Sequence, residues 1–372
     1  MDTLEQIALT RLTYTVLTAG FGVSVVLGWI MQRSHFCTMG AVSDIVNMGD
    51  WTRMRTWVLA MATGVLGLYG LGSLGYVDPL ASIYSNGRVL WLSAIVGGLL
   101  FGAGMVLASG CSSKTLLRIG GGSLKSLVVF VVMGLFSFMT LRGVLAVLRT
   151  STVDQINFDL PTALLPYLVV NAVGDPSPLL PAGLAMLPVF AALVWCFSSA
   201  EFRRSSQAVY GVLIGLAVVA MWLVSGYIGF VAEHPSTLEP TYVATNTGRM
   251  EALSFTAPMA YTLNWLIYFS DARNVLTLGV VSVFGLIGGS LLASIADRTF
   301  RWEGFSSTSD TALHLLGAAL MGVGGVTALG CTVGQGLSGI STLSITSFIA
   351  LGAIFAGSLI GFKIQLWVLM RD

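Results

Sequence analysis

The chain has 372 residues, of which 55% are hydrophobic and 9% charged, with a formal net charge of +1 and a mean hydropathy of +0.85. Because a soluble domain carries about 25% charged residues, most of this chain is expected to face lipid. The sequence has no basic run and no CxxC pair among its four cysteines, which argues against nucleic-acid binding, a zinc cluster and a thioredoxin-type site.

Apolar stretches of the length needed to cross a bilayer, about 20 residues, recur along the whole chain. The first follows an acidic N-terminus and is expected to be a retained span, not a signal peptide. The expected spans are 14–31, 55–75, 89–109, 125–148, 181–198, 208–230, 275–293, 311–329 and 346–369. Two shorter segments, 36–48 and 258–269, are expected to be re-entrant half-helices, and the middle of the connection 149–180 is expected to follow the membrane surface. The sequence therefore predicts an all-α polytopic membrane protein, with residues 1–372 as one transmembrane domain.

One phrase of the sequence occurs twice. GAGMVLASGCSSKTLLRIGGG at 102–122 returns as GVGGVTALGCTVGQGLSGIS at 322–341, and Gly110-Cys111 matches Gly330-Cys331. In each copy an apolar helix reaches the Gly-Cys pair and breaks. An odd number of expected spans separates the breaks, so the halves 12–180 and 181–372 are expected to be inverted copies related by a pseudo-two-fold axis. Broken helices at corresponding positions of two halves are typical of transporter binding sites.

The distribution of positive charge predicts the orientation in the membrane. With the N-terminus outside and the C-terminus cytoplasmic, the inner side receives most of the Lys and Arg residues, including Arg33, Arg203 and Arg204. Cytoplasmic loops carry such an excess. In this orientation the Cys111 break approaches from the cytoplasmic side and the Cys331 break from the opposite side.

The two breaks are predicted to meet near the bilayer midplane and to attract an anion. Irregular backbone is tolerated there only where it is buried in protein or lines a water-filled cavity. Half-helices that begin after the cysteines would direct unpaired N–H groups and positive dipole ends at the meeting point. The residues predicted to support this site are Gly110, Gly330, Ser112, Ser113, Lys114, Arg118, Thr332 and Gln335.

Thiols on this path suit an anion that contains sulfur, because a thiol is a weak donor that meets a large, polarizable surface softly. Cys37 follows a third break and joins Cys111 and Cys331 as a path residue, although its match in the second half is Ala257. Burial favours the S–H form, whereas nearby cations or a helix end favour the thiolate, which permits sulfur transfer. The sequence leaves both forms open. Cys196 is interpreted as a packing residue.

At these motifs the chain resembles the YeeE/YedE family of bacterial inner-membrane proteins, whose characterised members take up thiosulfate. The resemblance extends over nearly the whole length and depends on three cysteine motifs in order: GWIMQRSHFC at 28–37, GAGMVLASGC at 102–111, and LMGVG at 320–324 followed by Gly330-Cys331. It implies an hourglass shape with nine spans plus shorter helices. It also implies a thiol relay made of Cys37, Cys111 and Cys331, and a small cytosolic sulfur-carrier protein as a frequent partner.

Three departures from the family pattern stand out. Ser109 and Leu329 replace the first glycine of Gly-Gly-Cys, Ser34-His35 replaces a small-then-basic pair, and Lys114 replaces a glycine three residues after the second cysteine. The additional cation makes a sulfur-containing anion a safer prediction than thiosulfate alone.

The sequence thus predicts an inner-membrane importer that passes thiosulfate or a related anion between Cys331, Cys37 and Cys111. The expected protein is not an enzyme and uses no cofactor or metal, and it lacks a Walker lysine motif. Two alternatives stay open. One is a membrane sulfurtransferase that holds a persulfide on Cys111 or Cys37, and the other is a transporter of a different anion, such as a selenium or sulfite species.

Overall fold

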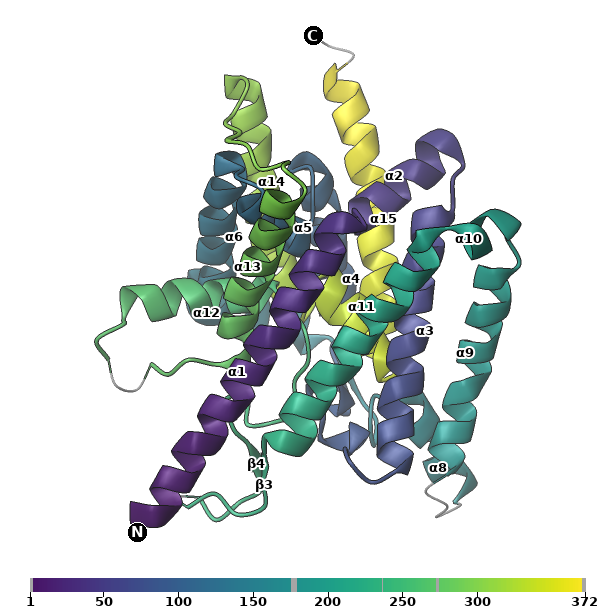
Figure 1. The fold of residues 1–372 in the computed structure, drawn as a ribbon, viewed down its shortest axis with the longest axis vertical. Helices are drawn as coiled ribbons and strands as arrows, with labels where there is room; N and C mark the ends of the chain where they lie inside the picture. Colours follow the sequence, from purple (N-terminus) through teal and green to yellow (C-terminus); the bar gives the residue numbers. More distant parts are fainter. Residues whose placement is uncertain (1–2, 175–178, 236, 272–273, 370–372) are drawn as a thin grey trace.

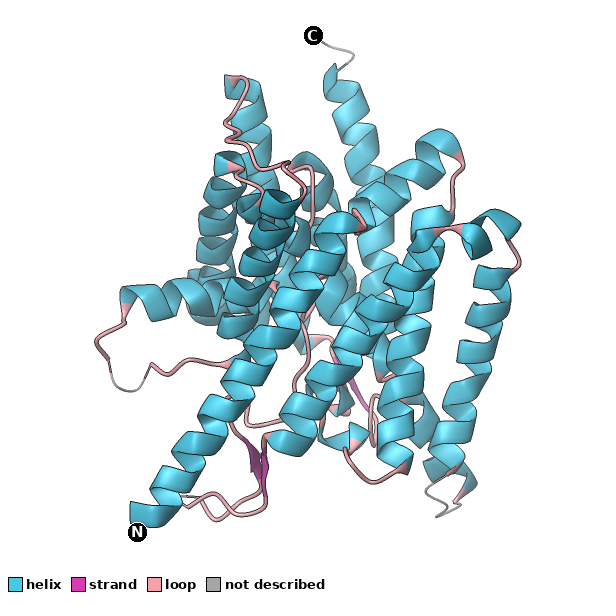
Figure 2. Cartoon of the chain, viewed as in Figure 1, coloured by secondary structure: helices cyan, strands magenta, loops and turns pink. Residues whose placement is uncertain are grey.

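In the computed structural model the chain forms a bundle of long helices with shorter helices between them and only two-residue strands (Figure 2). The structure describes residues 3–174, 179–235, 237–271 and 274–369. Within these ranges, 8 helical segments are long and apolar enough to cross a membrane: Gln6–Met48, Thr52–Ser73, Trp91–Gly120, Leu124–Arg142, Leu180–Phe197, Ser206–Ile228, Leu278–Ala296 and Ile345–Gln365. The protein is therefore an all-α polytopic membrane protein.

The elements follow one another in this order. The helices are α1 (Thr3–Arg33), α2 (Thr38–Met48), α3 (Thr52–Ser73), α4 (Trp91–Leu107), α5 (Ser112–Gly120), α6 (Leu124–Arg142), α7 (Val144–Ser151), α8 (Leu165–Val173), α9 (Leu180–Phe197), α10 (Ala200–Arg204), α11 (Ser206–Leu223), α12 (Thr256–Ile267), α13 (Leu278–Ala296), α14 (Thr308–Thr327) and α15 (Ile345–Leu369). Short helical turns are η1 (Pro79–Ala81), η2 (Ile83–Ser85), η3 (Val153–Gln155), η4 (Val224–Ile228) and η5 (Gly334–Gly339), the last two being π-helical. Strand β1 (Arg88–Val89) pairs antiparallel with β2 (Phe158–Asp159), and β3 (Phe230–Val231) pairs antiparallel with β4 (Thr241–Tyr242).

The expected spans fall on these long helices, with two differences. The expected span 311–329 is α14, which has 20 residues but begins with Thr308 to Thr311 and His314, polar residues that lower its hydropathy below that of the 8 spans. The expected continuous helix 125–148 was wrong, because Gly143 takes an extended conformation and separates α6 from α7. Glycine is a poor helix former, so a break at this position is inexpensive.

The shorter segments are helical as well. The segment expected at 36–48 is α2, and the one at 258–269 is α12, which lies crosswise to the long helices (Figure 1). The connection 149–180 contains α8 at the end of the bundle where α1 begins, and its residues 175–178 lie outside the described residues. Helix α1 begins at one end of the bundle and α15 finishes at the other (Figure 1).

The two copies of the repeated phrase pack against each other in opposite directions. A Cβ on Gly97 would meet the backbone of Gly324, and a Cβ on Gly104 would meet the backbone of Gly317. Residue numbers therefore rise along α4 as they fall along α14. Small residues at such a crossing let the two backbones approach closely. The repeat helices α4 and α14 are antiparallel neighbours, as inverted copies require.

Other helices of the two repeat copies also pack in matching pairs. Helix α1 packs on α13 where a Cβ on Gly289 would collide with the backbone oxygen of Val25, and α11 packs on α3 where Gly215 faces Ala60. The pair of α11 with α3 thus corresponds to the pair of α1 with α13, with α11 in the place of α1 and α3 in the place of α13. Helices α4 and α15 form a further pair, and its counterpart is α14 with α6. In each of these pairs, a helix from residues 1–180 packs on a helix from residues 181–372.

Candidate functional site

Three of the four cysteines follow the same kind of helix end. Two residues before each cysteine the backbone adopts the left-handed conformation that terminates helices. The residues in this conformation are His35, Ser109 and Leu329, with φ of 51°, 56° and 59°. None of them is glycine, so each pays the steric cost of a side chain in this region, about 1–2 kcal/mol.

Backbone hydrogen bonds close each helix end in the same pattern. The residue before each cysteine donates to a carbonyl five positions earlier: Phe36 to Met31 at 3.2 Å, Gly110 to Met105 at 2.8 Å, and Gly330 to Gly325 at 2.8 Å. The left-handed residue donates to the carbonyl three positions earlier in all three copies. These paired bonds define a Schellman motif, which satisfies carbonyl groups that the helix end would otherwise leave unpaired.

Each cysteine then occupies the N-cap position of a new helix. The Cys37 Sγ accepts from Gly40 N at 3.5 Å, and the Cys331 Sγ accepts from Gly334 N at 3.4 Å. The Cys111 thiol interacts with the backbone N–H of Lys114 in the same relative position. The first helical N–H groups lack intrahelical partners and carry the positive end of the helix dipole. Three sulfur atoms therefore lie at positive helix ends.

The three breaks converge on Cys111. Its thiol lies within interaction distance of the Cys37 thiol and of the Thr332 hydroxyl, and 3.3 Å separates its Sγ from Ser113 Oγ. Thr332 directly follows Cys331, so the two halves of the repeat meet at this point. Cys111 and Cys331 are fully buried, and Cys37 is 8% exposed. Cys111 thus lies between Cys37 and the turn that follows Cys331.

Two hydroxyls beside this series have no partner within the described ranges. Thr38 Oγ1 and Thr332 Oγ1 are buried and unpaired, and each belongs to the residue directly after a path cysteine. The equivalent residue after Cys111, Ser112, is 3.0 Å from Thr256 Oγ1. A buried hydroxyl without a partner costs about 1–3 kcal/mol. The unpaired hydroxyls are therefore groups that a ligand passing the thiols would satisfy.

A cavity of about 360 Å³ adjoins the Cys331 break. Gly330 and Gln335 line this cavity, together with Tyr84, Arg88 and Arg149, which are called its wall residues below. The Tyr84 hydroxyl donates to Gly334 O at 2.7 Å, so this wall residue also supports the half-helix that follows Cys331. The Gln335 amide donates to Ala328 O at 2.8 Å and accepts from Ser347 Oγ at 2.6 Å. Gln335 therefore holds the break in shape, which differs from the free donor role expected for it.

Three basic side chains, Lys114, Arg53 and Arg118, lie near Cys37 and Cys111. The ammonium group of Lys114 interacts electrostatically with both thiols and with Arg53 and Arg118. Arg53 pairs with Asp44 at 3.2 Å, whereas Lys114 has no carboxylate within salt-bridge distance in the described part of the chain. The thiol series thus ends at a half-buried, unneutralised cation.

Cys196 lies apart from these residues. It is fully buried in a cluster with Leu59 and Phe202, and its thiol donates to Arg55 O at 3.4 Å. Its packing role agrees with the sequence interpretation. The described residues contain no cluster of His, Cys, Asp and Glu that could hold a metal ion.

The sequence interpretation missed the cavity wall. Tyr84, Arg88 and Arg149 carry no motif, and they reach the Cys331 break from the η2–β1 segment and from α7. Ala257, the sequence match of Cys37, lies in the first turn of α12 and lines the same cavity. Helix α12 follows α11 in the chain, as α2 follows α1, but it contributes no thiol.

Helices that end just before buried cysteines, in a bundle whose long helices are apolar enough to cross a membrane, place this chain among the multi-pass integral membrane proteins. Residues 33–360 match the sequence profile described as sulphur transport, and the chain belongs to this family.

Similar proteins extend this match. The thiosulfate transporter TsuA of Escherichia coli is 26% identical over 351 residues, which cover 87% of each chain. TsuA of Spirochaeta thermophila is 26% identical over 366 residues, covering 96% of this chain and 100% of the relative. A probable transporter of E. coli, YedE, is 31% identical over 100 residues, only 22% of its own length.

Proposed function

We propose that this protein imports thiosulfate or a related sulfur-containing anion across the bacterial inner membrane. The observation that carries the proposal is the series Cys331, Thr332, Cys111 and Cys37, which leads from a cavity walled by Arg88 and Arg149 to Lys114. The likeness to proteins named thiosulfate transporters supports the same substrate class. In this proposal the N-terminus lies outside and the C-terminus in the cytoplasm.

The helix starts provide attraction without trapping the substrate. Each N-terminus carries the equivalent of about half a positive charge, which attracts a dianion less strongly than a fixed cation would. The thiols and the Thr332 hydroxyl act as weak donors to the sulfur and oxygen atoms of the anion. Weak sites in close succession allow an ion to enter and then to leave. The arginines of the outer cavity gather the anion, and Lys114 draws it toward the cytoplasmic end.

A transport assay tests this function. Purified protein in proteoliposomes should take up radiolabelled thiosulfate with saturation. Unlabelled thiosulfate should compete most strongly, and sulfite, selenite and sulfate should be compared beside it. Stronger competition by selenite or sulfite would reassign the substrate to the other anion class. Uptake equal to that of protein-free liposomes would overturn the proposal.

A second candidate function follows from the position of Lys114 beside Cys37 and Cys111, because a nearby cation favours the thiolate form of a cysteine. A Cys thiolate would attack the outer sulfur of thiosulfate, form a cysteine persulfide and release sulfite, so that one S–S bond forms as another breaks. Mass spectrometry after thiosulfate exposure separates the two functions, because a persulfide adds about 32 Da, one sulfur atom. An unmodified chain that still transports would leave the conduit function alone.

In either case a small cytosolic sulfur-carrier protein is the proposed partner on the inner side, where it would receive the sulfur that the membrane protein delivers. Co-purification of such a protein with the detergent-solubilised chain tests this pairing.

A further inference from the structure

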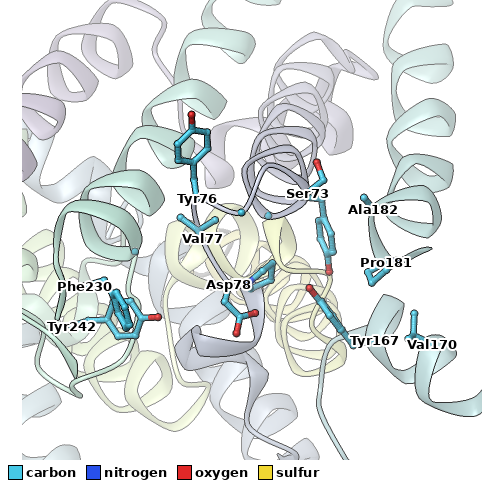
Figure 3. A pocket seen from close by; sticks show the side chains of 15 residues that line it. Ser73, Tyr76, Val77, Asp78, Tyr167, Val170, Pro181, Ala182, Phe230 and Tyr242 are labelled. Atoms are coloured by element: carbon cyan, nitrogen blue, oxygen red, sulfur yellow. The ribbon is translucent and has the colours of Figure 1, made fainter. Parts of the chain in front are cut away.

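A cavity of about 530 Å³ lies away from the thiol series, at the end of α3 where that helix leaves the bundle. The end of α3 and the loop after it form one side, α8 and the start of α9 form another, and β3 and β4 form the third (Figure 3). It shares no lining residue with the cavity at the Cys331 break. The proposed transport path therefore makes no use of it.

One carboxylate, Asp78, stands at the centre of this cavity (Figure 3). Its Oδ1 accepts from Leu80 N at 2.9 Å, which fixes the side chain as the cap of η1. No Lys, Arg or His side chain is among the residues that line the cavity. Among the described residues that line the cavity, Asp78 therefore has no positive neighbour, and the nearby Arg249 lies outside the lining, where it donates to Leu80 O at 3.4 Å.

Aromatic rings surround this carboxylate. In Figure 3 the hydroxyl groups of Tyr167 and Tyr242 are directed toward Asp78 from opposite sides. The Tyr167 ring stacks on Tyr69 with centroids 6.4 Å apart, and Tyr242 packs on Phe230 at 5.3 Å. Burial and the Asp78 charge raise the pKa of Tyr167 to about 12, so this phenol stays neutral. A carboxylate and two phenol oxygens directed at one space are acceptors that suit the N–H groups of an organic ammonium ion.

The position of the cavity indicates where such an ammonium group would come from. The spans α3 and α9 finish or begin at its edge, at Ser73 and Leu180. Apolar side chains next to it face outward, with Leu74 71% and Leu179 65% exposed. Tyrosines and apolar residues at span ends are typical of the membrane–water interface, where lipid headgroups lie.

We propose that this cavity binds the ammonium group of a zwitterionic phospholipid headgroup, with Asp78 as its counter-ion and the hydroxyl groups of Tyr167 and Tyr242 as further acceptors. The exposed Leu74 and Leu179 then contact the glycerol and acyl region of the same lipid. A bound lipid would join α3 to the α8–α9 segment, which packs at the edge of the bundle (Figure 1).

Lipid retention during native mass spectrometry tests the proposal. The wild-type protein, released from mixed phosphatidylethanolamine and phosphatidylglycerol, should retain phosphatidylethanolamine about tenfold in preference. Asp78→Ser should abolish this preference. Serine keeps an oxygen that can cap η1, so the fold is preserved while the charge is removed. Tyr167→Leu should weaken the preference as well.

Asp159→Ser is the matched control, because Asp159 is an exposed acid on β2 that does not line the cavity. The unfolding temperatures of Asp78→Ser and Tyr167→Leu should equal that of Asp159→Ser. With the fold so verified, the same ratio of retained phosphatidylethanolamine to phosphatidylglycerol in wild type and Asp78→Ser would overturn the proposal. Displacement of the lipid by millimolar ethanolamine from wild type, and not from Asp78→Ser, would show that the ammonium group is the recognised element and that a soluble amine also fits. Displacement from neither protein, together with retention that depends only on acyl length, would also overturn it.

Discussion

The thiols of Cys37 and Cys111 interact directly, at the N-termini of α2 and α5. In the described part of the chain, Cys331 shows no such interaction with either thiol, and it is the next residue, Thr332, that lies close to Cys111. In the proposed function, an anion that crosses the protein passes Cys111.

Replacement of Cys111 by alanine should lower thiosulfate uptake at least tenfold. A hydrogen bond to a charged partner contributes about 1.5–3 kcal/mol, and the variant loses this donor at the centre of the path. Uptake into proteoliposomes measures the loss. Cys196→Ala is the control, since Cys196 packs against Leu59 and Phe202 away from the path. Unimpaired uptake by Cys111→Ala would remove the thiols from the mechanism.

Uptake should rise as the external pH falls, because of Glu251. This carboxyl lines the cavity at the Cys331 break with Tyr84, Arg88, Arg149 and Tyr261. Burial raises the pKa of Glu251 above the ordinary value. Its negative charge, which repels an entering anion, is therefore lost at a higher pH than for an exposed glutamate. As the pH falls through the raised pKa, the arginines attract the anion more strongly, with Asp154 still paired to Arg149 at 3.2 Å.

Glu251→Gln imitates the protonated form and should show high uptake at neutral pH with a flat pH profile. Uptake between pH 5 and 8, with a fixed internal pH, provides the measurement. Glu239→Gln should keep the wild-type profile, because Glu239 is exposed and lies outside the cavity. An unchanged slope in Glu251→Gln would show that another group titrates.

Lys114 should control the cytoplasmic end of the path. Lys114→Met removes the unneutralised cation beside Cys37 and Cys111, so binding of the dianion from the inner side should weaken about tenfold. The KM for efflux from loaded vesicles should rise, whereas the KM for uptake from outside should stay the same. Lys363→Met, an exposed lysine on α15, is the control. Equal shifts on both sides would place Lys114 at a common site.

Because α1 and α13 are in close contact, substitution of Gly289 should destabilise the protein far more than substitution of the adjacent Gly288. A Cβ at Gly289 would collide with the backbone of Val25, whereas a Cβ at Gly288 would meet nothing within 4 Å. Gly289→Ala should destabilise the protein by about 1–3 kcal/mol, and Gly288→Ala should be neutral or slightly stabilising. Thermal unfolding in detergent compares the two. Similar unfolding temperatures would mean that α1 and α13 can separate without cost.

The sequence alone determined the features that depend on neighbouring residues. Hydropathy over about 20 residues located the membrane-crossing helices, because lipid rewards continuous apolar length. The repeated Gly-Cys pair located the breaks at Cys111 and Cys331, because a helix end is closed by hydrogen bonds within six residues. The order of three cysteine motifs also indicated the family to which the chain belongs.

Only the tertiary structure decided which of these local features meet. The contact of Cys37 with Cys111, the role of Thr332 between the halves, and the cavity wall of Arg88 and Arg149 bring together segments far apart in the chain. No local pattern encodes such contacts, because they follow from how α4, α14 and their partners pack. Packing also decided the role of Gln335. Its amide is hydrogen-bonded to the carbonyl of Ala328 and the hydroxyl of Ser347, so it stabilises the helix break and is not a free donor.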